Sequence, residues 1–136
     1  MKNINHLKHK ISNFSYFSKF IKINRFIIST GKLSEYYCRL LFGIKLNEKP
    51  NDLYDGVDAE NNKVEIKQRK SISRIPGGMK IDLKRIDYVL YVFLGDDLLP
   101  DEIIRINKKY ITKTSNERVS FKEVFVNKKY ETIYKR

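Results

Sequence analysis

The sequence lacks the features that mark secreted and membrane-embedded proteins. Cys38 is the single cysteine among 136 residues, which excludes an internal disulfide and fits a reducing, intracellular setting. No apolar run approaches the roughly 18–20 residues of a transmembrane helix. The basic N-terminus also lacks the compact apolar segment and small-residue cleavage site of a secretory signal. We therefore expect a cytoplasmic protein, neither secreted nor bound to a membrane.

Acidic residues are scarce as well, and the beginning of the chain has none. The chain has 28 Lys and Arg against 16 Asp and Glu, a net charge of +12, and a sequence pI of about 9.7. The first acidic residue is Glu35. This excess of positive charge favours an anionic partner, most simply nucleic acid, because Lys and Arg that neutralise phosphates release counterions. Composition alone does not separate DNA from RNA, a ribosome or an acidic membrane.

Length and composition indicate one packed domain. The 136 residues are 41% hydrophobic and include 8 Phe and 9 Tyr, enough for a single core. We see no internal repeat, low-complexity tract or second domain boundary. We expect one domain over residues 1–136, with a basic N-terminal segment (residues 1–30) and a basic C-terminal segment (residues 107–136). Apolar spacing in the N-terminal segment predicts an amphipathic helix that lies on DNA or a membrane surface, or packs on the core.

Local patterns predict an α/β fold. Residues 31–43 should form a helix that Thr30 caps and Gly43 ends. The expected buried stripe of this helix comprises Leu33, Tyr36, Tyr37, Leu40 and Leu41. Residues 88–94 are apolar without alternation, which predicts a central strand covered on both faces. Residues 95–97 should turn the chain into a further strand over residues 102–106.

The most informative segment is residues 58–67, which we expect to form a tight hairpin. Asn61-Asn62 is a plausible two-residue loop because Asn tolerates the positive φ of such turns. With that loop, the facing pairs would be Glu60 with Lys63, Ala59 with Val64, Asp58 with Glu65, and Gly56 with Lys67. Two facing carboxylates repel each other, so they call for a bound hard cation such as Mg²⁺. Asp55 is the rival first acid, but it would point to the opposite face of a regular strand, so we prefer Asp58.

The order Asp58…Glu65-Ile66-Lys67 resembles the motif of the PD-(D/E)XK nucleases, the restriction-endonuclease-like enzymes. Glu35 lies on the upstream helix, where this superfamily often carries an acid. The strands expected at residues 64–69 and 88–94 match the order of the family core, so the resemblance covers roughly residues 30–106. No proline precedes the first acid, and the Asp-to-Glu spacing is short. The resemblance implies a restriction-endonuclease-like α/β core, with a mixed central sheet of about four to five strands flanked by helices.

The same resemblance implies an Mg²⁺-dependent endodeoxyribonuclease, with Mn²⁺ able to substitute and no small-molecule cofactor. Asp58, Glu65 and the Ile66 carbonyl would bind the metal, and Lys67 would orient the attacking water or stabilise developing charge. Glu35 or Gln68 would complete the outer shell. A single site cuts one strand, so cleavage of duplex DNA would require a homodimer. The setting would be restriction, a mobile element or phage, or recombination and repair.

Basic residues outside the motif are expected to contact phosphates. Those nearest the motif lie in or beside a Gly77-Gly78 loop, and others lie in the C-terminal segment, interleaved with tyrosines. They are Arg69, Lys70, Arg74, Lys80, Lys108 and Lys109, with Lys128, Lys129, Tyr110, Tyr130 and Tyr134 as further surface candidates. The alternative function is a catalytically inactive, basic nucleic-acid-binding accessory protein that keeps the nuclease fold. A membrane-surface or ribosome-associated protein rests on charge alone.

Overall fold

The computed structural model of the protein describes residues 29–48, 53–70 and 79–136. The helix expected within residues 1–30 and the phosphate contact expected at Arg74 lie outside these residues. No helix in the described ranges is long and apolar enough to cross a membrane.

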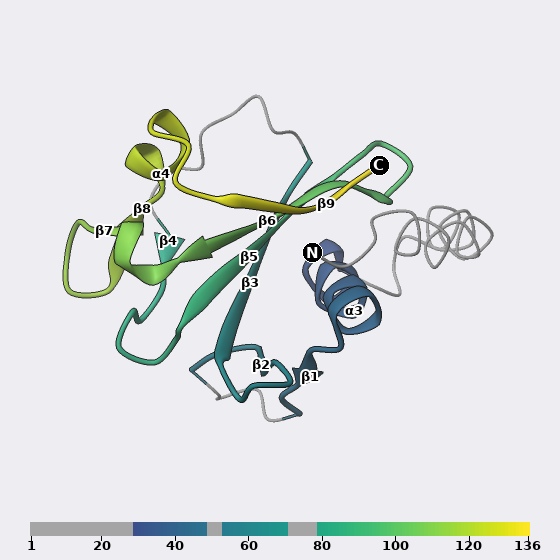
Figure 1. The fold of residues 1–136 in the computed structure, drawn as a ribbon, viewed down its shortest axis with the longest axis horizontal. Coiled ribbons are helices and arrows are strands. Elements are labelled where there is room, and N and C mark those ends of the chain that lie inside the picture. The colour runs from purple at the N-terminus through teal and green to yellow at the C-terminus, as the bar shows by residue number, and fades with distance from the viewer. Residues whose placement is uncertain (1–28, 49–52, 71–78) are drawn as a thin grey trace.

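A six-stranded mixed sheet forms the centre of the molecule (Figure 1). Its strands, in spatial order, are β1 (Lys45–Leu46), β2 (Gly56–Val57), β3 (Lys63–Arg69), β5 (Tyr88–Leu94), β6 (Pro100–Asn107) and β9 (Glu131–Lys135). Only β3 and β5 pair in parallel, and the other neighbours in this sheet are antiparallel. The expected α/β class with a mixed sheet is confirmed. The strand number is higher than expected because the sequence analysis did not predict β1, which has only two residues, or β9, which lies in the basic C-terminal segment.

Helix α3 (Thr30–Phe42) covers one face of this sheet. It begins one residue earlier than expected, at the N-cap Ser29, whose Oγ accepts the Lys32 N–H at 3.2 Å. It ends where expected, because Gly43 takes φ 68° and donates its N–H to the Arg39 carbonyl. Its buried face is rotated from the expected stripe, so Cys38 is fully buried whereas Tyr36 is 37% exposed.

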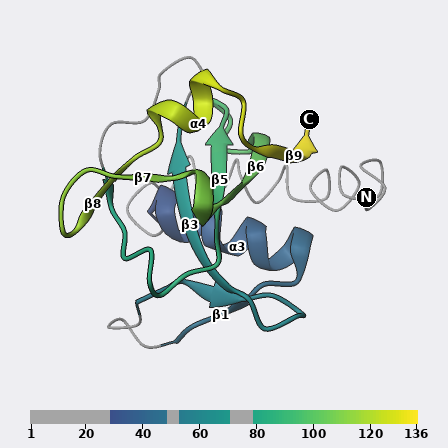
Figure 2. The same ribbon diagram turned by 60° about the vertical axis from the view of Figure 1, so that its left-hand side comes forward.

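The opposite face of the sheet carries a smaller three-stranded sheet and a short helix (Figure 2). The small sheet is β4 (Met79–Lys80), β8 (Arg118–Ser120) and β7 (Thr112–Lys113), and the helix is α4 (Lys122–Val126). Phe121, Val124 and Ile81 pack there on Val89, Tyr91 and Phe93 of β5. Each residue of β5 is buried, so the prediction of a central strand covered on both faces is confirmed.

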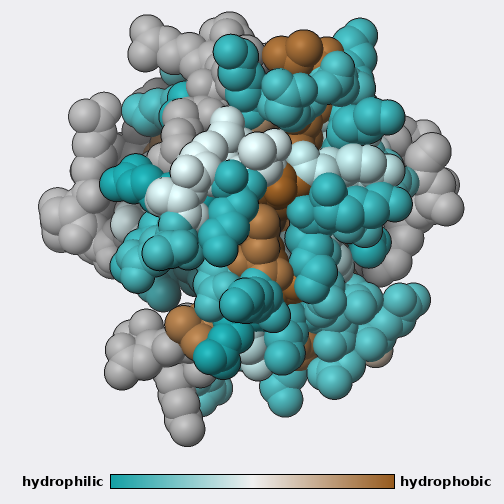
Figure 3. Space-filling view, turned by 90° about the vertical axis from the view of Figure 1, so that its left-hand side faces the viewer, coloured by the Kyte–Doolittle hydropathy of each residue, from teal (hydrophilic) through white to brown (hydrophobic). Residues whose placement is uncertain are grey.

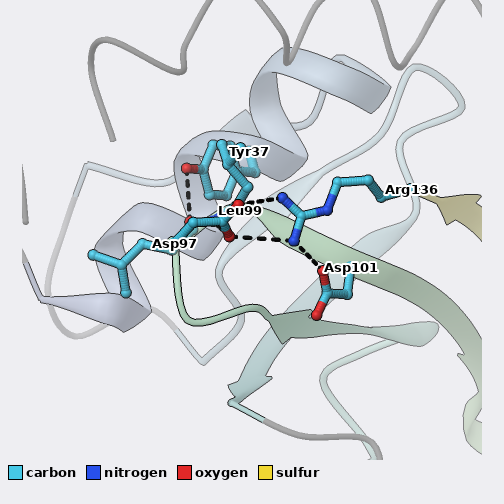
Figure 4. Close-up of polar contacts among 6 residues, drawn as sticks. Tyr37, Asp97, Leu99, Asp101 and Arg136 are labelled. Carbon is cyan, nitrogen blue, oxygen red and sulfur yellow. Dashed lines mark hydrogen bonds and ion pairs between the residues drawn. The ribbon is translucent and has the colours of Figure 1, made fainter. Parts of the chain in front are cut away.

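The end of β9 is tied to the turn between β5 and β6 (Figure 4). The Arg136 guanidinium contacts the carboxylates of Asp97 and Asp101, and the Tyr37 hydroxyl donates to the Leu98 carbonyl at 2.9 Å. The turn expected at residues 95–97 is present, because the Gly95 N–H donates to the Leu99 carbonyl at 2.8 Å. We call Arg136, Asp97 and Asp101 the C-terminal clamp.

Candidate active site

The hairpin before β3 differs in register from the sequence prediction. Gly56 lies opposite Val64 and Val57 opposite Lys63, whereas the two-residue loop would have placed Gly56 opposite Lys67. The register predicted for Glu60, Ala59 and Asp58 is therefore wrong as well. The turn spans residues 58–62 and closes with the Asp58 N–H donating to the Asn62 carbonyl at 3.1 Å. Within this turn, Asn61 is the one residue with positive φ, at 65°.

Asp58 explains this longer turn, because its carboxylate holds the loop together. Oδ1 accepts the N–H groups of Glu60 and Asn62, each at 2.9 Å, while Oδ2 accepts the Asn62 side-chain amide at 3.0 Å and the Tyr88 hydroxyl at 2.9 Å. Burial acts to raise the pKa of Asp58, but the hydrogen bonds from Asn62, Tyr88 and Glu60 outweigh it and hold that pKa below its ordinary value. The expected facing pair of Asp58 and Glu65 is not formed.

Asp55, the rival acid, lies beside Glu65 instead. Its backbone N–H donates to the Val64 carbonyl at 2.9 Å, and its Oδ2 accepts the Ile66 N–H at 2.6 Å. Val64 and Ile66 flank Glu65 in β3, so Asp55 is docked against the strand at that residue. The sequence argument against Asp55 assumed a regular strand from Asp55 to Asp58. The observed strand β2 contains only Gly56 and Val57, and Asp55 lies in the bend before it.

Glycine at position 56 makes this close docking feasible. A Cβ at Gly56 would lie 2.6 Å from the Lys45 carbonyl oxygen and 2.8 Å from the Ile44 side chain. Since real side chains do not approach so closely, any other residue would push β2 away from β1. Gly56 thus allows β2 to lie close against β1, and the backbone then holds Asp55 next to β3.

Glu65 and Lys67 form the second part of the site. Both project from the face of β3 opposite Val64 and Ile66, and the Lys67 Nζ lies 2.5 Å from the Glu65 Oε1. The two side chains are only 12% and 27% exposed for Glu65 and Lys67 respectively. Burial raises the pKa of Glu65, the negative charge of Asp55 raises it further, and Lys67 opposes both. Two carboxylates and one ammonium leave net negative charge in a partly dehydrated place.

Glu35 adds to this negative charge from helix α3. Its carboxylate pairs with the Lys32 ammonium at 3.5 Å, and its charge also contributes to the raised pKa of Glu65. Burial raises the pKa of the Cys38 thiol, and the negative charges of Asp55 and Glu35 raise it further. Gln68 does not join this cluster, since alternation along β3 directs it to the face of Ile66 rather than that of Glu65.

The candidate phosphate contacts are divided among several surfaces. Arg69 shares the strand face of Lys67 and lies beside the buried Tyr91 hydroxyl, whose pKa of about 12 reflects burial opposed by that guanidinium. Lys70 is exposed just after β3. Lys80 is already in an exposed ion pair with Glu117 at 3.0 Å. Lys108 and Lys109 lie in the 3-10 turn η1 (Lys108–Tyr110), at the far end of β6.

A divalent cation would have to use the Asp55–Glu65 pair. Within the described ranges, no three His, Cys, Asp or Glu side chains are grouped as a ready-made metal site. Magnesium fits a two-carboxylate site, because it keeps several waters and commonly takes one or two carboxylates together with substrate phosphate. Burial and the negative charge of Asp55 both raise the pKa of Glu65, and a bound cation would stabilise the ionised form of Glu65 against both effects.

No protein-family model matches the sequence, and no curated protein is significantly similar to it.

Proposed function

We propose that the protein is a divalent-metal-dependent nuclease of the PD-(D/E)XK type, with Asp55, Glu65 and Lys67 as its catalytic set. The observation that carries this proposal is the docking of the Asp55 carboxylate on the backbone of β3 next to Glu65, whose own carboxylate contacts the Lys67 ammonium. The motif order Asp, Glu, x, Lys is kept, and the first acid is Asp55 in place of Asp58.

The arrangement of elements supports the same proposal. Helix α3 precedes the β2–β3 hairpin, and β3 is followed by the buried parallel neighbour β5 and then by β6. That order agrees with the resemblance drawn from the sequence. A mixed sheet of this kind serves many activities, so the argument for function depends on the site rather than on the fold.

The two carboxylates would share the task of holding the cation. Asp55 and Glu65 would bind Mg²⁺ or Mn²⁺, with the Ile66 carbonyl as a backbone ligand. A cation bound there would polarise the scissile phosphate and supply a water of lowered pKa. Glu35, whose charge already reaches Glu65, would act in the outer shell and orient the ligands.

Lys67 would contact the substrate phosphate and would not bind the metal. A cation bound by Asp55 and Glu65 would compete with Lys67 for the Glu65 carboxylate. The Lys67 ammonium, which lies 2.5 Å from that carboxylate, would then be free to stabilise negative charge on the phosphate oxygens. Arg69 and Lys70, which lie at the end of the same strand and just after it, would hold the flanking phosphates of DNA. A single site of this kind nicks one strand, so a double-strand break would require a homodimer.

A plasmid-nicking assay tests the proposal. Wild-type protein should convert supercoiled DNA to the nicked or linear form with Mg²⁺ and should not do so in EDTA. Glu65→Gln and Lys67→Met should lower the rate by at least about 100-fold. The exposed Glu60→Gln variant is the matched control, and it should cut as wild type does. Cleavage that persists in Glu65→Gln would refute the assignment, and binding without any cleavage would favour the inactive accessory protein.

A further inference from the structure

A cleft away from the carboxylate site gathers basic and aromatic side chains from three separate segments. The end of β6, the turn η1 and the connection between α4 and β9 line an open cavity of about 400 Å³. Four cations line it, together with two tyrosines: Arg105, Lys109, Lys128, Lys129, Tyr110 and Tyr130. We call this cavity the basic cleft. Figure 3 faces the side of the molecule where Figure 1 labels β7, β8 and α4, and it shows mostly hydrophilic side chains around a narrow apolar strip.

The protein offsets only part of the positive charge in the basic cleft. Glu131 is its single acidic lining residue, and within the described part of the chain none of the four cations forms an ion pair. Three of them lie against an aromatic ring. The Arg105 guanidinium is 4.0 Å from the centre of the Tyr88 ring, and the Lys109 and Lys129 ammonium groups are 4.9 Å and 5.8 Å from the centre of the Tyr110 ring. Like charges held this close repel each other, and an anion that enters between them removes that repulsion.

The backbone conformation at Lys128 is unfavourable for a lysine. Lys128 follows the C-cap of α4 and has φ 49°, a left-handed conformation that glycine or asparagine normally provides. The turn is fixed by the Lys129 N–H, which donates to the Val124 carbonyl at 2.9 Å. A lysine at this position strains the backbone and aids the fold less than glycine would, so the side chain is the feature that needs an explanation.

We propose that the basic cleft binds single-stranded nucleic acid, with the lysines on phosphates and Tyr110 against a base. The cavity falls in the roughly 300–1,000 Å³ range of small-ligand pockets, which suits a nucleotide-sized group. A duplex presents a convex backbone with its bases stacked inside, so it can touch the rim but cannot offer a base to Tyr110, which is 39% exposed. The basic cleft shares no residue with the Asp55, Glu65 and Lys67 site, and the proposal holds whether or not that site is catalytic.

Binding of a fluorescent oligothymidylate of about 15 nucleotides, measured by anisotropy in EDTA, tests this inference. The Lys109→Ala, Lys129→Ala double variant should bind about tenfold more weakly. It should also flatten the slope of log affinity against log salt by about 1.4, which is about 0.7 for each phosphate that is no longer neutralised. The matched control is Lys122→Ala, Lys135→Ala, which removes the same charge from exposed positions of the C-terminal segment outside the cleft. It should stay within about threefold of wild type. Equal weakening in both double variants would overturn the proposal.

Two single variants separate binding from folding. Lys128→Gly should raise the melting temperature, because glycine accepts φ 49° without strain, and should still weaken oligonucleotide binding. Unchanged or tighter binding would contradict the assigned role. Tyr110→Leu should weaken binding about tenfold, whereas Tyr110→Phe, which keeps the ring, should match wild type.

The choice of partner is tested with the same protein preparations. Duplex DNA of equal length should bind more weakly than the single strand, and vesicles with phosphatidylserine should not respond to the cleft substitutions. Preference for the duplex, or cleft-dependent binding to vesicles alone, would overturn the proposal. Because these measurements use EDTA, they report binding without cleavage. Intact binding here, together with no nicking in the Mg²⁺ assay, would count against the nuclease and leave the basic cleft standing.

Discussion

Two carboxylates three residues apart, Asp58 and Asp55, have opposite relations to their surroundings. The fold supplies Asp58 with four hydrogen-bond donors, and its pKa is lowered as a result. Asp55 is held by a backbone N–H at a place where its charge raises the pKa of a neighbouring carboxylate, Glu65. The first arrangement stabilises a turn, while the second stores electrostatic repulsion. Repulsion that the fold offsets only in part, here through Lys67, is the better mark of a binding site.

The largest expected difference between the two residues is in cleavage. Asp55→Asn should lower the rate of Mg²⁺-dependent plasmid nicking by at least about 100-fold, because it removes a charged metal ligand. Asp58→Asn should leave the rate within a few-fold of wild type, since the amide oxygen can still accept the backbone N–H groups of Glu60 and Asn62. The reverse pattern would mean that Asp58 reaches the metal after all.

The free energy of unfolding should depend more on Asp58 than on Asp55, the reverse of the order expected for cleavage. Asp58→Ala removes the acceptor for four donors and should lower the free energy of unfolding by about 1–2 kcal/mol in urea titration. The exposed neighbour Glu60, changed to Ala, should alter it by less than about 0.5 kcal/mol. Tolerance of Asp58→Ala with no loss of stability would show that the turn does not depend on its carboxylate.

A divalent cation bound by Asp55 and Glu65 should stabilise the folded protein. At a Mg²⁺ concentration tenfold above the dissociation constant, mass action predicts about 1.4 kcal/mol of added stability for wild type. Glu65→Gln should lose most of this gain, which thermal melts with and without Mg²⁺ would detect. Equal shifts in both proteins would indicate that the cation binds elsewhere.

Asp97 of the C-terminal clamp is a second carboxylate with hydrogen-bond donors from the fold. Its contribution to the free energy of unfolding should be the smallest of those considered. Burial acts to raise the pKa of Asp97, but hydrogen bonds from Arg136 and Leu99 outweigh it and lower that pKa. A group with a lowered folded-state pKa stabilises the protein above its unfolded pKa, about 3.9, and loses that contribution as pH falls through the folded value.

Arg136→Ala should therefore be destabilising at pH 7 and nearly neutral in strong acid. Both partners are more than a third exposed, so screening should keep the effect below about 1 kcal/mol. Urea titrations of wild type and Arg136→Ala over a range of pH measure this difference, with Lys135→Ala as the control. A destabilisation that does not change with pH would mean that packing, rather than the ion pairs, fixes β9.

The contrast between the two acids also shows what the sequence could and could not predict. The buried strand β5 and the end of α3 at Gly43 were predictable, because an unbroken apolar run and a left-handed glycine are strong local signals. The hairpin register was not, since it depends on a carboxylate that bonds to its own loop and on a tyrosine 30 residues away. Asp58 followed by Asn61 and Asn62 is a usable signal for such a side-chain-closed turn.

The error in register moved the prediction from one acid to the other. A two-residue loop shifts the pairing by three positions, and an odd shift transfers every side chain to the other face of the hairpin. Glu65 and Lys67 were unaffected, because their spacing within one strand fixes their shared face. The basic cleft was predictable only in part, since Arg105 joins Lys109 and Lys129 through sheet pairing that no local pattern reveals.

Direct binding of Mn²⁺, followed by calorimetry on three proteins, tests the central claim that Asp55 and Glu65 form the cation site. Wild type and Asp58→Asn should bind Mn²⁺ with similar affinity, whereas Asp55→Asn should bind at least about tenfold more weakly because one of two charged ligands is gone. Equal affinity in Asp55→Asn and wild type, or a loss confined to Asp58→Asn, would contradict the account.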